Sequence, residues 1–141
     1  MRKLLIAFLA VALLFSGCAS DPEDVLEIGE RFFVNQTLSI VLNQHEYVGR
    51  MVRYEGIFAT FPDQGTDTHL VYRYVPGCCS PSGIVGFIVE IGDLEPLPTN
   101  AWAEVEGVFE EFIDHNGHTS LRVAATSLRE LEERGSELVR P

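Results

Sequence analysis

The chain has 141 residues, with 10 Lys and Arg against 21 Asp and Glu, and a formal net charge of −11. This length is sufficient for one domain, and the acidity argues against nucleic-acid binding because polyanions are bound by basic surfaces. Hydrophobic residues make up 46% of the chain and aromatic residues 10%. That is enough apolar material for a packed core, and it excludes a disordered acidic tail.

The N-terminus has the pattern of a bacterial lipoprotein leader. Met1-Arg2-Lys3 is basic, residues 4–15 carry no charge, and Phe15-Ser16-Gly17-Cys18 resembles a lipobox, with Phe15 where Leu is usual. Twelve helical residues span about 18 Å, short of the ~30 Å hydrocarbon core of a bilayer. We therefore predict a signal peptide over residues 1–17 and lipidation of Cys18. An ordinary secretory signal and an uncleaved anchor are the alternatives.

Cleavage before Cys18 would place the mature protein in the cell envelope, anchored to the membrane and facing its extracytoplasmic side. We divide it into the lipidated cysteine with a tether (18–30), one β-barrel domain (31–135) and a C-terminal tail (136–141). The acidic domain would be repelled by anionic headgroups, so we expect the lipid alone to provide the attachment.

Alternation of apolar and polar residues predicts a mainly β domain with short flanking helices. Five segments are predicted to be strands: 50–61, 69–75, 83–91, 101–113 and 119–126. Residues 24–34 are predicted to form a weak helix or an irregular arm. Residues 37–47 fit a short helix or a strand, and Leu38, Val41 and Leu42 would share one helical face. Ser127-Leu128-Arg129-Glu130 resembles a capping box that opens a last helix, ended by Gly135.

Asn116-Gly117 lies between the last two predicted strands, and this dipeptide is typical of a two-residue hairpin turn. Such a turn fixes the pairing of the strands that it joins. The cross-strand pairs that it predicts are His115 with His118, Phe112 with Leu121, and Glu111 with Arg122.

Two strands share a short motif with a glycine in mid-strand, Glu55-Gly56-Ile57-Phe58 and Glu106-Gly107-Val108-Phe109. A glycine there indicates a sharp bend or a bulge. Five strands, two of them bent, favour a small OB-like barrel in which the first strand closes against the fourth. An open β-sandwich and a smaller α+β fold are the alternatives.

Cys78 and Cys79 would be the two thiols left after lipidation of Cys18. Three states are open to them. They could pack as small apolar residues, form a strained vicinal disulfide, or hold Zn²⁺ or Cu⁺ with further ligands. Adjacent Cα atoms are about 3.8 Å apart, below the usual range for a disulfide, so a vicinal bond would suit a redox switch. His69 is the candidate companion of the pair.

His115 and His118 form a weaker metal hypothesis, because residues opposite each other in a hairpin point to one face. The simpler interpretation is two solvated turn residues. No Ser lies in a G-x-S-x-G elbow and no Gly-rich loop suggests a phosphate site, so the sequence favours a protein without catalytic activity.

Several short motifs resemble a family of bacterial envelope proteins, mostly from Gram-positive anaerobes. They lie between residues 30 and 127, and they include Tyr47-Val48-Gly49-Arg50, a loop with paired cysteines at Pro76-Gly77-Cys78-Cys79, and Trp102-x-Glu104-Val105-Glu106-Gly107. The pattern is also similar to the soluble C-terminal half of YcgQ-type membrane proteins. Ser80-Pro81-Ser82-Gly83 replaces a Gly-x-Asp-Gly stretch that the relatives carry.

The resemblance implies an envelope location and a membrane permease or another envelope protein as partner. Together with the residues, it predicts a membrane-anchored module that binds a partner or a glycan without catalysis. The alternative is a metal-handling or thiol-redox lipoprotein that uses Cys78 and Cys79 and serves a permease.

Overall fold

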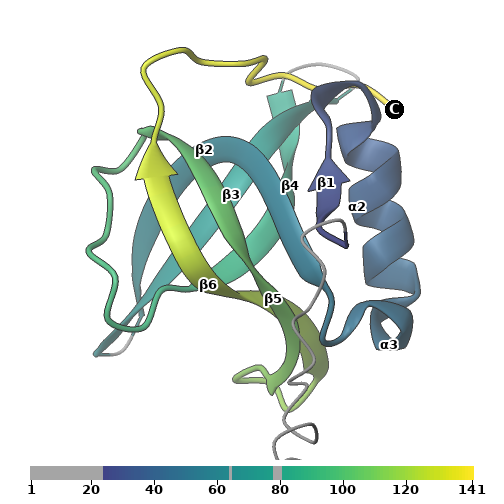
Figure 1. The fold of residues 1–141 in the computed structure, drawn as a ribbon, viewed down its shortest axis with the longest axis vertical. Helices are drawn as coiled ribbons and strands as arrows, with labels where there is room; N and C mark the ends of the chain where they lie inside the picture. The colour runs from purple at the N-terminus through teal and green to yellow at the C-terminus, as the bar shows by residue number, and fades with distance from the viewer. Residues whose placement is uncertain (1–23, 64, 78–80) are drawn as a thin grey trace, which may run out of the picture.

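The strands form one sheet that curls into a closed barrel (Figure 1). This computed structural model describes residues 24–63, 65–77 and 81–141. Its strands are β1 (Leu26–Ile28), β2 (Met51–Asp63), β3 (Thr66–Pro76), β4 (Pro81–Glu90), β5 (Trp102–Ile113) and β6 (Thr119–Glu130). Its helices are the single turn η1 (Glu30–Phe32), α2 (Phe33–Leu42) and α3 (Gln44–Tyr47).

The topology confirms the predicted OB-like barrel. β2, β3 and β4 form an antiparallel meander, β4 pairs in parallel with β6, and β6 pairs antiparallel with β5. β5 then pairs with the first half of β2, from Met51↔Val108 to Ile57↔Trp102, and closes the barrel. The closure of the first long strand against the fourth is therefore as predicted.

The two mid-strand glycines lie where the barrel turns. β2 changes partner from β5 to β3 at Ile57, next to Gly56. A Cβ on Gly56 would lie 2.7 Å from the carbonyl oxygen of Tyr72, so only glycine lets the strands approach this closely. At Gly107 the pairing of β5 with β6 shifts register, which confirms the predicted bulge there.

The N-terminal segment differs from the prediction of a weak helix or an irregular arm. β1 pairs in parallel with the start of β2, and η1 follows it. Residues 37–47 are helical, as one of the two alternatives predicted, but α2 begins earlier, at Phe33, and α3 follows it. The buried residues of α2 are Phe33, Thr37 and Ile40, which form one stripe at i, i+4 and i+7.

The face of Leu38, Val41 and Leu42 that suggested a helix is the exposed face. These side chains are 51%, 44% and 72% exposed. Phe33 occupies the place in the core instead, where its ring lies 6.0 Å from that of Tyr54. The sequence pattern thus identified the helix but not the face that packs.

The predicted helix after Ser127 is wrong, because β6 continues to Glu130. Leu128 pairs with Val105 of β5 and packs against the barrel core, and this pairing outweighs the local capping signal. Further on, residues near the C-terminus add to the edge of β3. The N–H of Tyr74 donates to Glu137 O at 2.7 Å, and the N–H of Val139 donates to Tyr74 O at 2.8 Å.

The predicted hairpin register is also wrong, by one residue. Phe112 pairs with Ser120, Glu111 with Leu121 and Glu110 with Arg122, so His115 and His118 are not opposite each other. The N–H of Asp114 donates to His118 O, and Gly117 takes a φ of 81°. Asn116-Gly117 therefore belongs to a three-residue loop with glycine in the left-handed region, and not to a two-residue turn.

A buried arginine joins both ends of the domain to the barrel. Arg73 of β3 is 2% exposed, and its Nε donates to Glu55 O at 2.9 Å. Its Nη1 donates to Ser136 O at 3.0 Å and to the Glu30 carboxylate at 3.1 Å. The guanidinium lies 4.8 Å from the ring centres of both Phe33 and Trp102. These partners of the guanidinium thus come from before, within and after the barrel.

Candidate binding groove

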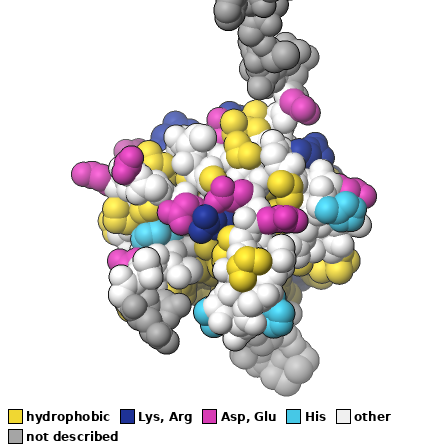
Figure 2. Space-filling view, turned by 90° about the horizontal axis from the view of Figure 1, so that it is seen from below, with side chains coloured by type: hydrophobic (Ala, Val, Ile, Leu, Met, Phe, Trp, Pro, Cys, Tyr) yellow, Lys and Arg dark blue, Asp and Glu magenta, His cyan; other side chains and the backbone are white. Residues whose placement is uncertain are grey.

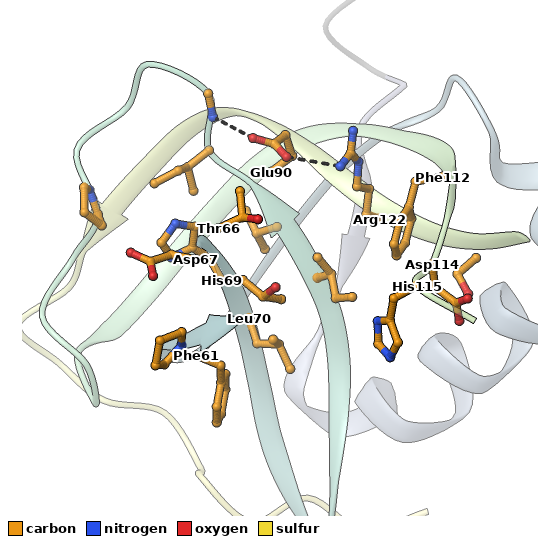
Figure 3. A pocket seen from close by; sticks show the side chains of 18 of the residues that line it. Phe61, Thr66, Asp67, His69, Leu70, Glu90, Phe112, Asp114, His115 and Arg122 are labelled. Atoms are coloured by element: carbon orange, nitrogen blue, oxygen red, sulfur yellow. Dashed lines mark hydrogen bonds and ion pairs between the residues drawn. The ribbon is translucent and has the colours of Figure 1, made fainter. Parts of the chain in front are cut away.

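A groove of about 1100 Å³ lies at one end of the barrel. It lies where β2 passes into β3, where β4 ends, and where β5 turns into β6 (Figure 3). Gly65, with a φ of 99°, allows the tight connection between β2 and β3. Three connections thus border the groove, and the strands between them form its floor.

Apolar side chains make up much of the groove. Leu70 and Ile88 lie on its floor strands, and Phe112 lines it from β5. At its edges, Phe61 is 48% exposed and Ile113 is 67% exposed. Exposed aromatic and aliphatic groups that gather in one hollow are typical of a binding surface.

His69 lies in this groove. Its Nδ1 is 3.0 Å from the hydroxyl of Thr60, and its ring stacks on Phe58 with centres 5.5 Å apart. Pro76 is seven positions further along β3, about 23 Å away in an extended strand. The described part of β3 therefore places His69 at the opposite end of the strand from Pro76.

The groove is acidic, because Asp67, Glu90 and Asp114 line it together with a single arginine. Arg122 is the one Lys or Arg among the described residues that line it, and it donates to Glu110 at 2.7 Å and to Glu90 at 3.1 Å. Its guanidinium lies 5.3 Å from the Phe112 ring centre. Glu90 also accepts the N–H of Gly92 at 3.3 Å. Figure 3 shows the ion pair of Arg122 with Glu90 at one rim of the groove.

Asp114 orders the hairpin loop between β5 and β6. Its carboxylate accepts the N–H groups of Asn116 at 2.8 Å and His118 at 2.9 Å. These backbone hydrogen bonds, that of His118 first, lower the pKa of Asp114, with a smaller contribution from the nearby imidazoles. His115 lines the groove, whereas the His118 side chain is 77% exposed and 3.7 Å from Asp114.

The metal hypotheses are not supported by a ligand cluster among the residues that the structure describes. No three His, Cys, Asp or Glu side chains converge within residues 24–63, 65–77 and 81–141. Cys18, Cys78 and Cys79 lie outside these ranges. Pro76 pairs with Pro81, so the cysteine pair belongs to the connection between β3 and β4.

Sequence reasoning missed the groove as a site. A signal for the groove was present in Phe61 and Ile113. These large apolar residues lie at strand ends beside turn residues, and side chains at such positions are expected to be exposed. The acidic character of the chain was visible from the sequence, and Figure 2 shows acidic side chains spread among apolar ones on one face.

The strand order, the closure of β2 against β5 and the parallel pair of β4 and β6 define the class of OB-like barrels. Within this class, the chain belongs to the family of the DUF1980 C-terminal domain, which matches residues 19–136. This is the soluble domain of YcgQ-type membrane proteins, and the match confirms the resemblance noted in the sequence. No curated protein and no solved structure matches the chain.

Membership of this family is consistent with an association with the cell envelope. Among the residues that the structure describes, no helix is long and apolar enough to cross a membrane.

Proposed function

We propose that this protein is a lipid-anchored, extracytoplasmic binding module whose groove holds a neutral oligosaccharide of the cell envelope without catalysing a reaction on it. The groove itself carries the proposal. It is long, open and partly apolar, and it lies on the barrel face and between the loops with which OB barrels bind oligonucleotides and oligosaccharides.

Electrostatics favour a neutral ligand over a polyanion. The chain has a formal net charge of −11, and Asp67, Glu90 and Asp114 line the groove with Arg122 as the opposing cation. Because Arg122 is already paired with Glu90 and Glu110, it offers little attraction to a phosphate backbone. A nucleic acid is therefore a poor ligand for this face.

The side chains suit a sugar in two ways. Phe61 and Phe112 offer aromatic faces, on which the C–H faces of sugar rings pack. Thr66 and Ser120 add uncharged hydrogen-bonding groups beside them. A small number of polar groups on an apolar surface fixes the orientation of a ligand while burial provides affinity.

Two of the three acidic groups that line the groove are poorly suited to acid–base catalysis. Glu90 is engaged by Arg122, and the Asp114 carboxylate is held by backbone N–H groups. The pKa of Asp114 is lowered, whereas a general acid at neutral pH needs a raised pKa. These constraints favour binding over turnover.

Attachment through Cys18 completes the proposal. Asp24, where the described structure begins, is six positions after it in the chain. The lipid would hold the barrel close to the extracytoplasmic surface of the membrane, where a permease or another envelope protein could be its partner. A mass spectrum of the N-terminal peptide from membrane-purified protein tests this part directly, because acylation of Cys18 adds the mass of the lipid.

Titration with N-acetylglucosamine oligomers, followed by NMR of ¹⁵N-labelled protein, tests the groove. We expect shifts at amides of the groove, and weaker binding by Phe61→Ala. Phe32→Ala is the matched control, because Phe32 is 57% exposed and is not among the groove residues. Shifts confined to other surfaces, or equal binding by both variants, would contradict the proposal.

A thiol site remains the second candidate function. The observation that favours it is that both cysteines belong to the connection between Pro76 and Pro81, at the end of β3 away from His69. A metal there would be Zn²⁺ or Cu⁺ held by two thiolates and by further ligands, for which His69 is the sequence-predicted candidate.

A further inference from the structure

The outer side of α2 is an apolar surface without a partner in the described structure. We define the outer apolar face as Leu38, Val41 and Leu42, which are adjacent on the helix at i, i+3 and i+4 and are 51%, 44% and 72% exposed. Three large apolar side chains grouped on one helix are an interaction surface rather than isolated exposed residues.

The surroundings of this face are unusual for so acidic a chain. No charged residue occurs from Phe32 to Gln44. Arginines lie beyond both ends of the segment, where Arg31 stacks on Phe32 at 5.6 Å and Arg50 stacks on Tyr47 at 5.3 Å. An apolar helix face with arginines and an aromatic ring at its ends is typical of a helix that lies at a membrane surface.

The position of the tether leads to the same surface. β1 and α2 lie side by side (Figure 1). They are joined by Gln36, whose Nε2 donates to Glu27 O and whose Oε1 accepts the N–H of Gly29, both at 3.2 Å. The chain rises along β1 and returns along α2, so the residues after Gln36 extend back toward Asp24, where the described chain begins.

Distance along the chain limits how far this end lies from the membrane. The six steps along the chain from Cys18 to Asp24 reach at most about 20 Å when fully extended. The second half of α2, from Gln36 to Leu42, runs about 9 Å back toward that point. A lipid on Cys18 would therefore keep the outer apolar face within reach of the bilayer.

We infer that the outer apolar face of α2 rests on the lipid bilayer and orients the barrel there, an inference that rests on the proposed anchoring through Cys18. Three side chains fall short of the ~1,000 Å² that a specific protein interface buries. They suffice for a second, weaker contact beside an acyl anchor. The net charge does not prevent this contact, because charges more than about 8 Å away are screened at physiological salt.

The orientation has a consequence for the groove. Figure 1 shows the connection of β2 with β3, which borders the groove, on the side of the barrel away from α2. With α2 on the bilayer, this border points away from the membrane, toward ligands of the envelope.

Quenching by brominated lipid tests the contact. The full chain is purified from membranes with detergent and returned to phosphatidylcholine vesicles, with or without brominated acyl chains. Leu42→Trp reports the outer apolar face, and Phe61→Trp is the control because Phe61 is also exposed but lies on the groove side. The native Trp102 is 1% exposed and contributes the same background to both.

We expect brominated lipid to quench most of the added emission of Leu42→Trp, with a shift to shorter wavelength, and to leave that of Phe61→Trp unchanged. Adding Leu38→Asp to Leu42→Trp should reduce the quenching while the circular dichroism spectrum stays the same. The inference alone would be overturned if brominated lipid quenched both added tryptophans equally. This comparison requires acylated protein that floats with the lipid.

Two further outcomes are decisive. An N-terminal peptide without an acyl group would overturn the anchoring, and the inference with it. The second outcome is that brominated lipid does not quench Leu42→Trp in pure lipid vesicles, although this tryptophan is buried in native membranes. That result would assign the face to a membrane protein and overturn the bilayer contact.

Discussion

Replacing Arg73 by leucine should remove a large part of the stability of the barrel. The guanidinium donates to two neutral carbonyl oxygens, Glu55 O at 2.9 Å and Ser136 O at 3.0 Å. A hydrogen bond from a charged donor contributes roughly 1.5–3 kcal/mol, so the two together contribute about 3–6 kcal/mol. The pair with Glu30 adds little, because that carboxylate is 53% exposed.

Leucine regains part of this loss by burying apolar surface, about 1–2 kcal/mol. The net expectation for Arg73→Leu is a fall of about 2–4 kcal/mol in the free energy of unfolding, against about 5–15 kcal/mol for a whole domain. The matched control is Arg129→Leu. Arg129 also lies on a strand and pairs with Glu104 at 2.7 Å, but its side chain is 64% exposed. Such a surface pair contributes about 0–1 kcal/mol.

Urea denaturation followed by far-ultraviolet circular dichroism measures both changes. This signal is preferable to fluorescence, because Trp102 stacks on Arg73 and its emission would change with the substitution itself. With a slope of about 1.5 kcal/mol per M, the midpoint should fall by roughly 2 M for Arg73→Leu. A fall for Arg73→Leu no larger than that for Arg129→Leu would refute the reasoning.

Three further predictions test other parts of the molecule. A Cβ at Gly86 would lie 2.7 Å from a Cα of β3, so Gly86→Ala should cost about 1–3 kcal/mol of unfolding free energy, while Gly29→Ala, with open space around it, should cost far less. The pKa of Glu30 is lowered below its ordinary 4.5, chiefly by a backbone N–H and then by the buried arginine. Stability should therefore be retained above pH 4.5 and fall as the pH drops through the lowered pKa, and Glu30→Gln should flatten this part of the stability profile. If Cys78 and Cys79 hold metal, calorimetry should show stoichiometric Zn²⁺ or Cu⁺ binding that Cys78→Ser abolishes, whereas oligosaccharide binding in the groove should be the same in that variant.

The strands of the barrel could be predicted because their signal is local. Alternation of apolar and polar residues marks the segments that become β2 to β6, and a glycine in mid-strand marks where a barrel must bend. Gly56 and Gly107 thus predicted both the curvature and the closing pair.

The errors arose where two local signals compete. Asn116-Gly117 fits a two-residue turn and also a three-residue loop with glycine at the left-handed position. The choice between them shifts every cross-strand pair of β5 and β6 by one residue. The sequence from Ser127 to Glu130 caps a helix well, but pairing with β5 is decided by residues more than twenty positions away. Local patterns carry no information on such distant partners.

The groove and Arg73 could not be predicted for a related reason. The groove exists because three connections meet at one end of a closed barrel, which only the topology decides. Arg73 lies in an alternating strand, where an arginine suggests a solvent-facing position. Its burial depends on Phe33 from α2 and on Ser136 near the C-terminus, both distant in sequence.

The closure of β2 against β5 has a consequence for the order of folding. The paired strands are about fifty positions apart in the chain, and pairing between such distant segments forms slowly because the intervening loop must first lose its freedom. A nascent chain that contains only the β2–β4 meander has an unclosed sheet and no complete core. The complete core therefore forms only after β5 has been made and has closed on β2.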